Sequence, residues 1–146
     1  MKAFRDETWR LARDGDAAGL HRAAGLLSDY DGHRARAFAL AVEGRLDDAL
    51  AQLSENRAQD WPFPAAYAAD LGRVRFLAGD YERSLAALQP AVRGVDRLDP
   101  ALADLVSDVV SREPKLRLRA VKLLLTGGTI RQRLRNATAA ATSRNR

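Results

Sequence analysis

The sequence predicts an all-α protein made of short antiparallel helix hairpins. Three observations lead to this prediction. Apolar residues recur at spacings of three and four along nearly all of the 146 residues, as in Leu46, Leu50 and Leu53. No stretch alternates between apolar and polar residues for long enough to indicate a strand. Glycines at regular intervals divide the periodic segments into pieces of ordinary helix length.

Nine helices are expected along the chain. The joints at Gly15-Asp16, Gly44 and Gly79-Asp80 each end one periodic run and begin the next within a few residues. They predict helix-turn-helix connections with little loop between the helices. The expected helices span residues 3–14, 17–28, 31–43, 46–57, 64–78, 81–94, 100–111, 115–125 and 129–141.

Polar residues before the expected helix starts support these boundaries. Asp16 and Asp80 are placed to accept hydrogen bonds from the first backbone N–H groups of the following helix. Asp99 has the same role before Pro100, because proline is tolerated in the first turn of a helix.

Two helices beyond residue 100 have wide apolar faces. The second, over 115–125, combines six large apolar residues with Lys115, Arg119 and Lys122 on one narrow stripe. Such a helix, apolar beneath and charged outside, is expected to close a stack of hairpins. Residues 137–146 are rich in Ala, Thr, Ser, Arg and Asn and predict a flexible tail.

A hairpin unit recurs around the three joint glycines, which lie 29 and 35 residues apart. The clearest copy runs from Ala68 to Ala91 and resembles a tetratricopeptide repeat. The matching residues are Leu71, Gly72, Gly79, Asp80, Tyr81, Ser84, Leu88 and Ala91. A second copy covers Ala37 to Leu53, and a weaker one covers Trp9 to Leu20.

The resemblance implies a short right-handed solenoid of three tetratricopeptide-like hairpins over residues 1–96. Residues 97–136 would then form basic C-terminal capping helices, followed by the tail. Stacking is expected because a single hairpin cannot bury its apolar face alone.

Positive charge is concentrated in the last quarter of the chain. The net charge is +5, yet residues 1–112 hold 15 Lys and Arg against 18 Asp and Glu, a net of −3. Residues 113–146 hold nine cations against Glu113 alone, a net of +8. Binding to nucleic acid would therefore depend on the C-terminal segment and not on the whole protein.

The motifs of catalysis and metal binding are missing from the sequence. The chain has no cysteine, and its two histidines, His21 and His33, are not spaced as metal ligands. No nucleophile elbow, phosphate-binding loop or dinucleotide fingerprint occurs. The amides of the Gly-rich turn over 126–129 could hold a phosphate next to Arg131 and Arg133, but a helix C-cap followed by Thr129 as an N-cap is the favoured interpretation. We therefore expect no enzyme activity, no cofactor and no metal.

The resemblance also implies a partner-binding groove, because tetratricopeptide proteins line one with the first helix of each hairpin. The groove would carry Arg5, Trp9, Arg13, Arg34, Phe38, Arg73 and Phe76. Arginines and aromatic rings together suit an acidic peptide or a C-terminal carboxylate. In the alternative, the three aromatic residues form the core between repeats and the arginines a solvated rim.

The basic C-terminus has three interpretations. Its cations include Lys115, Arg119, Lys122, Arg131, Arg133 and Arg135. They dock on the acidic body or remain solvated, they bind the phosphates of nucleic acid, or they contact another protein or an anionic membrane. No aromatic residue lies among these cations, so stacking on single-stranded bases has no support.

These observations together predict a non-catalytic protein-interaction or scaffold module. The alternative is a nucleic-acid-associated protein that uses residues 113–146. A cytoplasmic location is expected, because Met1–Glu7 lacks the apolar stretch of a secretory signal and no apolar run is long enough for an integral membrane segment. An open end of the stack, or an exposed face of Leu123, Leu124 and Leu125, would also favour a homo-oligomer.

Overall fold

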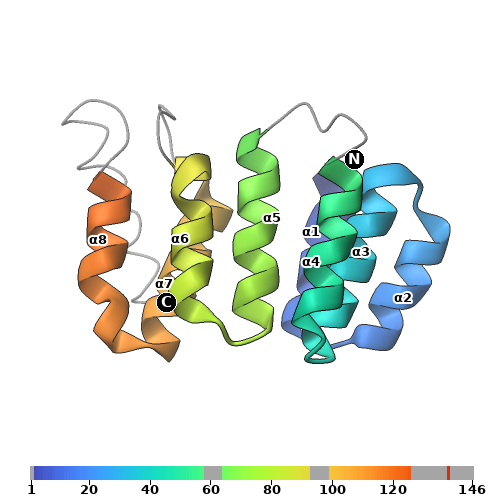
Figure 1. Cartoon of the computed structure of the whole chain (residues 1–146), viewed down its shortest axis with the longest axis horizontal. Helices are drawn as coiled ribbons and strands as arrows, with labels where there is room; N and C mark the ends of the chain where they lie inside the picture. Colours follow the sequence, from blue (N-terminus) through green and yellow to red (C-terminus); the bar gives the residue numbers. More distant parts are fainter. Residues whose placement is uncertain (1, 58–63, 93–98, 126–137, 139–146) are drawn as a thin grey trace. The chain divides into compact units, whose positions relative to one another are not determined.

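The computed structural model of the chain describes residues 2–57, 64–92, 99–125 and 138 (Figure 1). These residues form helices and no strand, so the all-α prediction is confirmed. The helices are α1 (Lys2–Arg13), α2 (Ala17–Leu26), α3 (Asp29–Val42), α4 (Leu46–Arg57), α5 (Pro64–Leu77), α6 (Tyr81–Val92), α7 (Pro100–Arg112) and α8 (Arg117–Leu125), with a 3₁₀ turn, η1 (Pro114–Leu116), before α8.

The helix boundaries lie within about two residues of the predicted ones, but the start of the predicted helix over 115–125 is a 3₁₀ turn. Glu113 has φ −137° and ψ 80°, because the residue before a proline is pushed out of the helical region. Pro114 therefore starts a separate 3₁₀ turn, and α8 begins after it. The predicted helix over 129–141 and the predicted tail lie outside the described residues, apart from Thr138.

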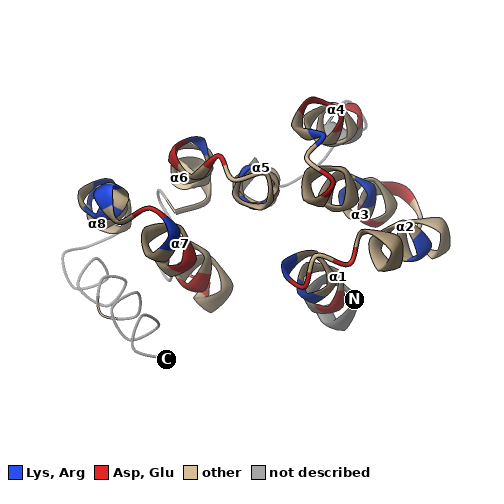
Figure 2. Cartoon of the chain, turned by 90° about the horizontal axis from the view of Figure 1, so that it is seen from below, with Lys and Arg blue, Asp and Glu red and all other residues tan. Residues whose placement is uncertain are grey.

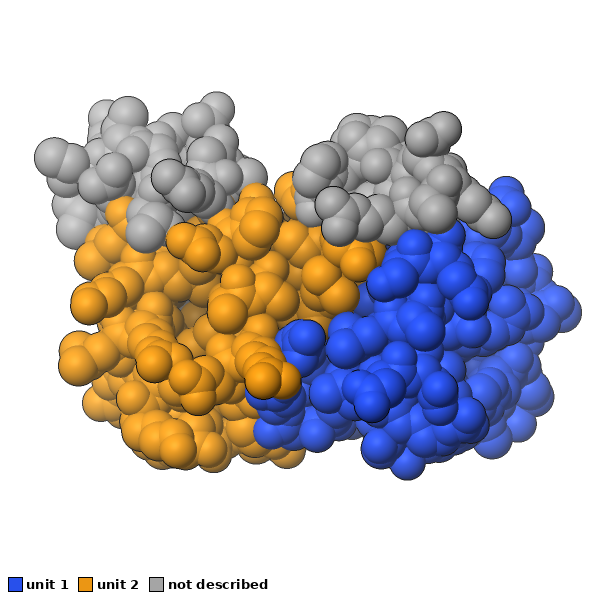
Figure 3. All heavy atoms as spheres, viewed as in Figure 1, with its two compact units in different colours: residues 1–63, 73–80 blue, residues 64–72, 81–146 orange. Residues whose placement is uncertain are grey.

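The chain divides into two compact units (Figure 3). Unit 1 comprises residues 1–63 and 73–80, and unit 2 comprises residues 64–72 and 81–146. In unit 1, α3 packs against α1, α2 and α4, and α1 also contacts α2. In unit 2, α6 packs against α7 and α8, and η1 contacts both α7 and α8. The division at residues 96 and 136 stays a prediction from the sequence pattern.

The three predicted glycine joints share one backbone geometry. Gly15, Gly44 and Gly79 have φ of +74°, +80° and +79°, in the left-handed region that glycine enters without steric cost. The residue after each glycine donates its N–H to a carbonyl five residues back: Asp16 to Leu11 at 3.0 Å, Arg45 to Leu40 at 2.8 Å and Asp80 to Arg75 at 2.9 Å. These bonds satisfy the last carbonyls of α1, α3 and α5.

Two of the predicted capping aspartates make the expected hydrogen bonds. Asp16 accepts from the backbone N–H of Gly19 at 2.8 Å at the start of α2. Asp99 accepts from the backbone N–H of Ala101 at 2.9 Å, with Pro100 in the first turn of α7. The carboxylate of Asp80, at the third joint, accepts from Nη1 of Arg75 at 3.0 Å. Local polar residues thus fix where α2 and α7 begin.

Helix α3 forms the centre of unit 1. It buries four alanines together with Phe38, and alanine lets neighbouring helices approach closely. Leu20 from α2 and Leu53 from α4 are also fully buried. In Figure 1, α3 and α4 lie side by side and are joined by the turn at Gly44. The core of unit 2 is formed by Leu88, Val92, Leu105, Val106 and Val109.

Three residues of the family pattern, Gly72, Ser84 and Leu88, meet in unit 2. A Cβ atom at Gly72 would lie 2.4 Å from Cδ2 and 2.7 Å from Cγ of Leu88, so the Leu88 side chain would have to shift to admit any larger residue. Leu88 is fully buried and has little room to move. The hydroxyl of buried Ser84 donates to the carbonyl of Gly72 at 2.7 Å. The small residues at 72 and 84 thus bring α6 into close contact with the first part of α5.

Candidate binding surfaces

Three aromatic side chains pack against one another in unit 1. Trp9 from α1 lies with its ring centroid 5.6 Å from Phe38 of α3, at an interplanar angle of 63°. Its ring is 6.4 Å from that of Phe76 in α5, at 55°. Both arrangements are tilted or edge-to-face, which the ring quadrupoles favour. The three helices that supply these rings are far apart in sequence.

Two arginines stack on these rings. The guanidinium carbon of Arg34 lies 4.6 Å from the centroid of Phe38, and that of Arg73 lies 5.6 Å from the ring of Trp9. Both distances are within the range of cation–π attraction. We call Trp9, Arg34, Phe38, Arg73 and Phe76 the Trp9 cluster. The family resemblance implied that all five residues share one surface, and the structure brings them into contact.

Burial separates the predicted groove residues into two groups. Phe38 and Phe76 are buried, and Arg34 is only 4% exposed, so these three form the base of the Trp9 cluster. Trp9 and Arg73 are partly exposed, and Arg13 is exposed near the end of α1. The side chain of Arg5 lies outside the described residues. Phe38 and Phe76 are thus core residues, as the alternative interpretation of the groove expects. Trp9 and Arg73 remain accessible to solvent.

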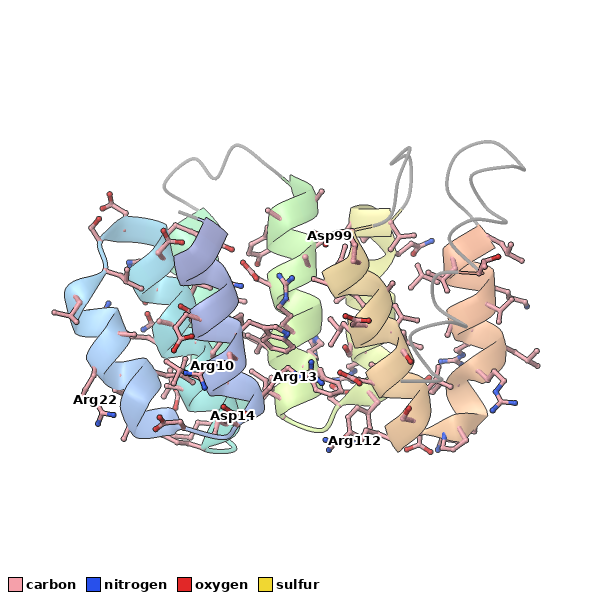
Figure 4. All side chains as sticks on the ribbon, turned by 180° about the vertical axis from the view of Figure 1, so that it is seen from behind. Arg10, Arg13, Asp14, Arg22, Asp99 and Arg112 are labelled. Carbon is pink, nitrogen blue, oxygen red and sulfur yellow. The ribbon has the colours of Figure 1, made fainter. Side chains whose placement is uncertain are left out.

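The exposed charges of α1 differ in their surroundings (Figure 4). Arg10 donates to Asp14 at 3.0 Å and forms an ion pair with Glu7, whose pKa it lowers by hydrogen bonding and by its charge. Arg13 lies on another side of the same helix. The charge of Arg10 is therefore compensated by neighbours along the chain. Arg13 is exposed, and the family resemblance assigned it to the groove.

The basic residues of the C-terminal segment are described only in part. Lys115, Arg119 and Lys122 are exposed, in η1 and α8. Nζ of Lys115 lies 3.6 Å from the carboxylate of Glu113, and Arg119 forms an ion pair with Glu82 of α6. Arg131, Arg133 and Arg135 lie outside the described residues. One of these cations, Arg119, is therefore paired with an acid of the same unit.

A shallow groove of about 220 Å³ lies between α6 and α8. It is lined by Glu82, Leu85, Ala86, Gln89, Arg119, Lys122 and Leu123.

The hydrogen bond and the charge of Arg119 hold the pKa of Glu82 below its ordinary value, and the charges of Lys115 and Arg83 act in the same direction. Glu82 and Arg119 join α6 to α8 at the groove.

Replacing Arg119 by glutamine should raise the pKa of Glu82 toward its ordinary value, because its main hydrogen-bond donor and nearest cation are lost. In the native chain Glu82 is ionised and paired with Arg119 at pH values above the ordinary carboxyl pKa. The pair is lost as the pH falls through the lower pKa that Glu82 has in the folded chain. Carboxyl ¹³C shifts of Glu82 followed by NMR measure both values. Lys122→Gln is the matched control, and an unchanged Glu82 pKa in Arg119→Gln would contradict the pairing.

The apolar residues of α8 lie on two faces. The sequence pattern put the cations on one narrow stripe and apolar residues over most of the remaining surface, as expected for a helix that is buried beneath and charged outside. Ala120, Leu123 and Leu124 are indeed buried, but Leu118 is 77%, Val121 43% and Leu125 37% exposed. These three are spaced at positions i, i+3 and i+7, so they share one side of the helix. Periodicity alone did not distinguish the two faces, because apolar residues occupy both.

Both histidines hydrogen-bond to side chains of neighbouring segments. Nε2 of His21 lies 2.8 Å from Oε1 of Glu43, and Nδ1 of His33 lies 3.0 Å from Oε1 of Gln52. Within the described parts of the chain, no three His, Cys, Asp or Glu side chains come together as a metal site would require. The turn over 126–129 lies outside these parts.

Comparisons with known proteins assign no function to the chain. No family model, no curated protein and no solved structure matches the chain. The tetratricopeptide resemblance therefore stays a prediction. Among the helices that the structure describes, none has the length and apolar character needed to cross a membrane.

Proposed function

We propose that the chain is a tetratricopeptide-like, non-catalytic interaction module. In this proposal an acidic segment of a partner protein binds the surface of unit 1 formed by Trp9, Arg13 and Arg73. Two features support the hairpin classification. The joints at Gly15, Gly44 and Gly79 repeat one cap geometry, and Gly72 accepts its hydrogen bond from Ser84 at the positions of the family pattern.

The stacking of Arg73 on Trp9 is the observation that carries the binding proposal. Both side chains are partly exposed, and the guanidinium carbon of Arg73 lies 5.6 Å from the centroid of the Trp9 ring. A guanidinium stacked on a ring has its N–H donors directed sideways, where they suit a carboxylate. The buried Phe38 beneath Trp9 fixes the position of the indole. A surface held rigidly in this way loses little conformational entropy on binding.

Affinity capture from native cell extract, with and without nuclease, tests the proposal. The full-length chain is compared with Arg73→Glu and Arg13→Glu. Arg22→Glu is the control, because it makes the same charge change and Arg22 is exposed on α2, a helix that supplies no residue of the Trp9 cluster (Figure 4). Arg34→Glu is unsuitable, because its guanidinium is buried and an acid there would destabilise the fold.

We expect Arg73→Glu and Arg13→Glu to recover at least about tenfold less of a nuclease-resistant protein partner, since each places an acid where a carboxylate should bind. Arg22→Glu should recover as much as the native chain. Circular dichroism must show that all variants remain helical. Recovery of nuclease-sensitive material alone, unchanged by Arg73→Glu, would refute the proposal and favour nucleic-acid binding through residues 113–146.

A further inference from the structure

The outer face of α8 is an exposed apolar surface in unit 2, separate from the Trp9 cluster. Leu118, Val121 and Leu125 form this face, and Leu118 is 77% exposed. The opposite side of α8 contributes Leu123 and Leu124 to the core. The contacts of α8 with α6, α7 and η1 therefore leave the outer face to solvent. Three neighbouring exposed apolar side chains on one side of a helix are a candidate interaction surface.

Positive charges border the outer face on both sides. At 100° per residue, Arg117 lies beside Val121 on one edge, and Lys122 lies beside Leu118 on the other. Both cations are exposed. The sequence of α8, Arg117–Leu125, contains three cations and no acid. Its ribbon is accordingly blue and tan in Figure 2. A ligand of this face should therefore be apolar along its centre and acidic along its edges.

Like charge argues against two occupants from the chain itself. Two copies that meet through α8 would bring the same cations together around the apolar row, and like charges opposed across an interface oppose association. Residues 126–146 follow α8 directly, but they contain five arginines and no Asp or Glu. That segment therefore has no acid to pair with Arg117 or Lys122.

The shape of the face favours a helix over a lipid surface. Val121 and Leu125 are more than half covered, so Leu118 alone protrudes strongly. Interfacial helices commonly carry a longer apolar face with aromatic anchors, and α8 has nine residues and no aromatic one. A short apolar row at positions i, i+3 and i+7 instead matches the row of a second helix laid against it.

We infer that the outer face of α8 docks an acidic amphipathic helix of a partner protein. Leu118, Val121 and Leu125 would pack against its apolar row, while Arg117 and Lys122 would pair with acids on its flanks. This inference stands apart from the proposal for unit 1, because every residue it uses belongs to unit 2.

Synthetic peptides of about 20 residues provide the probe, since shorter helices are marginal in water. One labelled peptide carries a leucine row flanked by glutamates. A second labelled peptide carries lysines in place of the glutamates. Fluorescence anisotropy measures binding to the full chain and to Leu118→Asp, Lys122→Glu and Arg22→Glu. Leu118→Asp should fold, because the side chain is exposed.

The glutamate peptide should bind at least about tenfold more tightly than the lysine peptide. Leu118→Asp and Lys122→Glu should each weaken its binding about tenfold or more, and Arg22→Glu should have no effect. Equal binding of the two peptides, or binding unaffected by Leu118→Asp, would overturn the inference. Two further results would also overturn it: dimerisation of the chain abolished by Leu118→Asp in sedimentation, or Leu118-dependent binding to phosphatidylglycerol–phosphatidylcholine vesicles stronger than to the peptide.

Discussion

Replacing Phe38 by alanine is expected to lower the free energy of unfolding by about 3–5 kcal/mol. Phe38 is fully buried in α3, where its ring contacts Trp9 and carries the guanidinium of Arg34. The substitution opens a cavity in unit 1 and removes the ring from beneath a buried cation. Urea denaturation followed by circular dichroism measures the change.

The control for this substitution is Leu26→Ala. Leu26 is 88% exposed, so its truncation should change stability by less than about 0.5 kcal/mol. A loss below about 1 kcal/mol for Phe38→Ala would mean that the ring is not packed as described. Phe38→Ala should also weaken partner capture, because Trp9 would lose the side chain that positions it.

Replacing Gly72 by alanine should destabilise the chain by about 1–3 kcal/mol, although alanine is the better helix former. The added methyl group would lie 2.4 Å from Cδ2 of Leu88 and 3.3 Å from the carbonyl of Ser84. Gly25→Ala in α2 is the matched control, because nothing lies within 4 Å of its added Cβ. That substitution should be neutral or stabilise the chain by up to about 1 kcal/mol.

A double-mutant cycle makes the Gly72 test specific. In a Leu88→Ala background, Gly72→Ala should lose most of its cost, because the side chain that it strikes has been shortened. The unfolding free energies of the four proteins give the coupling energy. Additive effects of the two substitutions would show that α5 and α6 do not approach as closely as described, and would remove one support for the hairpin classification.

Local signals explain why the helices could be predicted. Asp16 and Asp99 cap their helices through side-chain hydrogen bonds, and each joint glycine adopts the left-handed conformation that its position requires. Such features depend on a few adjacent residues and can be read along the chain. Pro114 was a visible signal too, and its effect on Glu113 explains the 3₁₀ turn that periodicity overlooked.

The binding surfaces were less predictable, because burial depends on which helices meet. The residues of the Trp9 cluster were found from the family resemblance, but the sequence did not separate buried Arg34 from partly exposed Arg73. The ion pair between Arg119 and Glu82 joins residues 37 positions apart and has no local signal. The sequence pattern allowed an exposed face of Leu123, Leu124 and Leu125, but of these only Leu125 is exposed. The pattern did not separate them, because apolar residues of the core and of the surface look alike in sequence.

Fluorescence of Trp9 tests the proposed binding surface most directly. The chain has two tryptophans, so Trp61→Phe leaves Trp9 as the single reporter. The captured partner is titrated into this variant and into the same variant carrying Arg73→Glu. We expect a saturable change in Trp9 emission that Arg73→Glu weakens at least about tenfold. Saturable partner binding with no change in Trp9 emission, and with equal affinity for both variants, would contradict the proposed site.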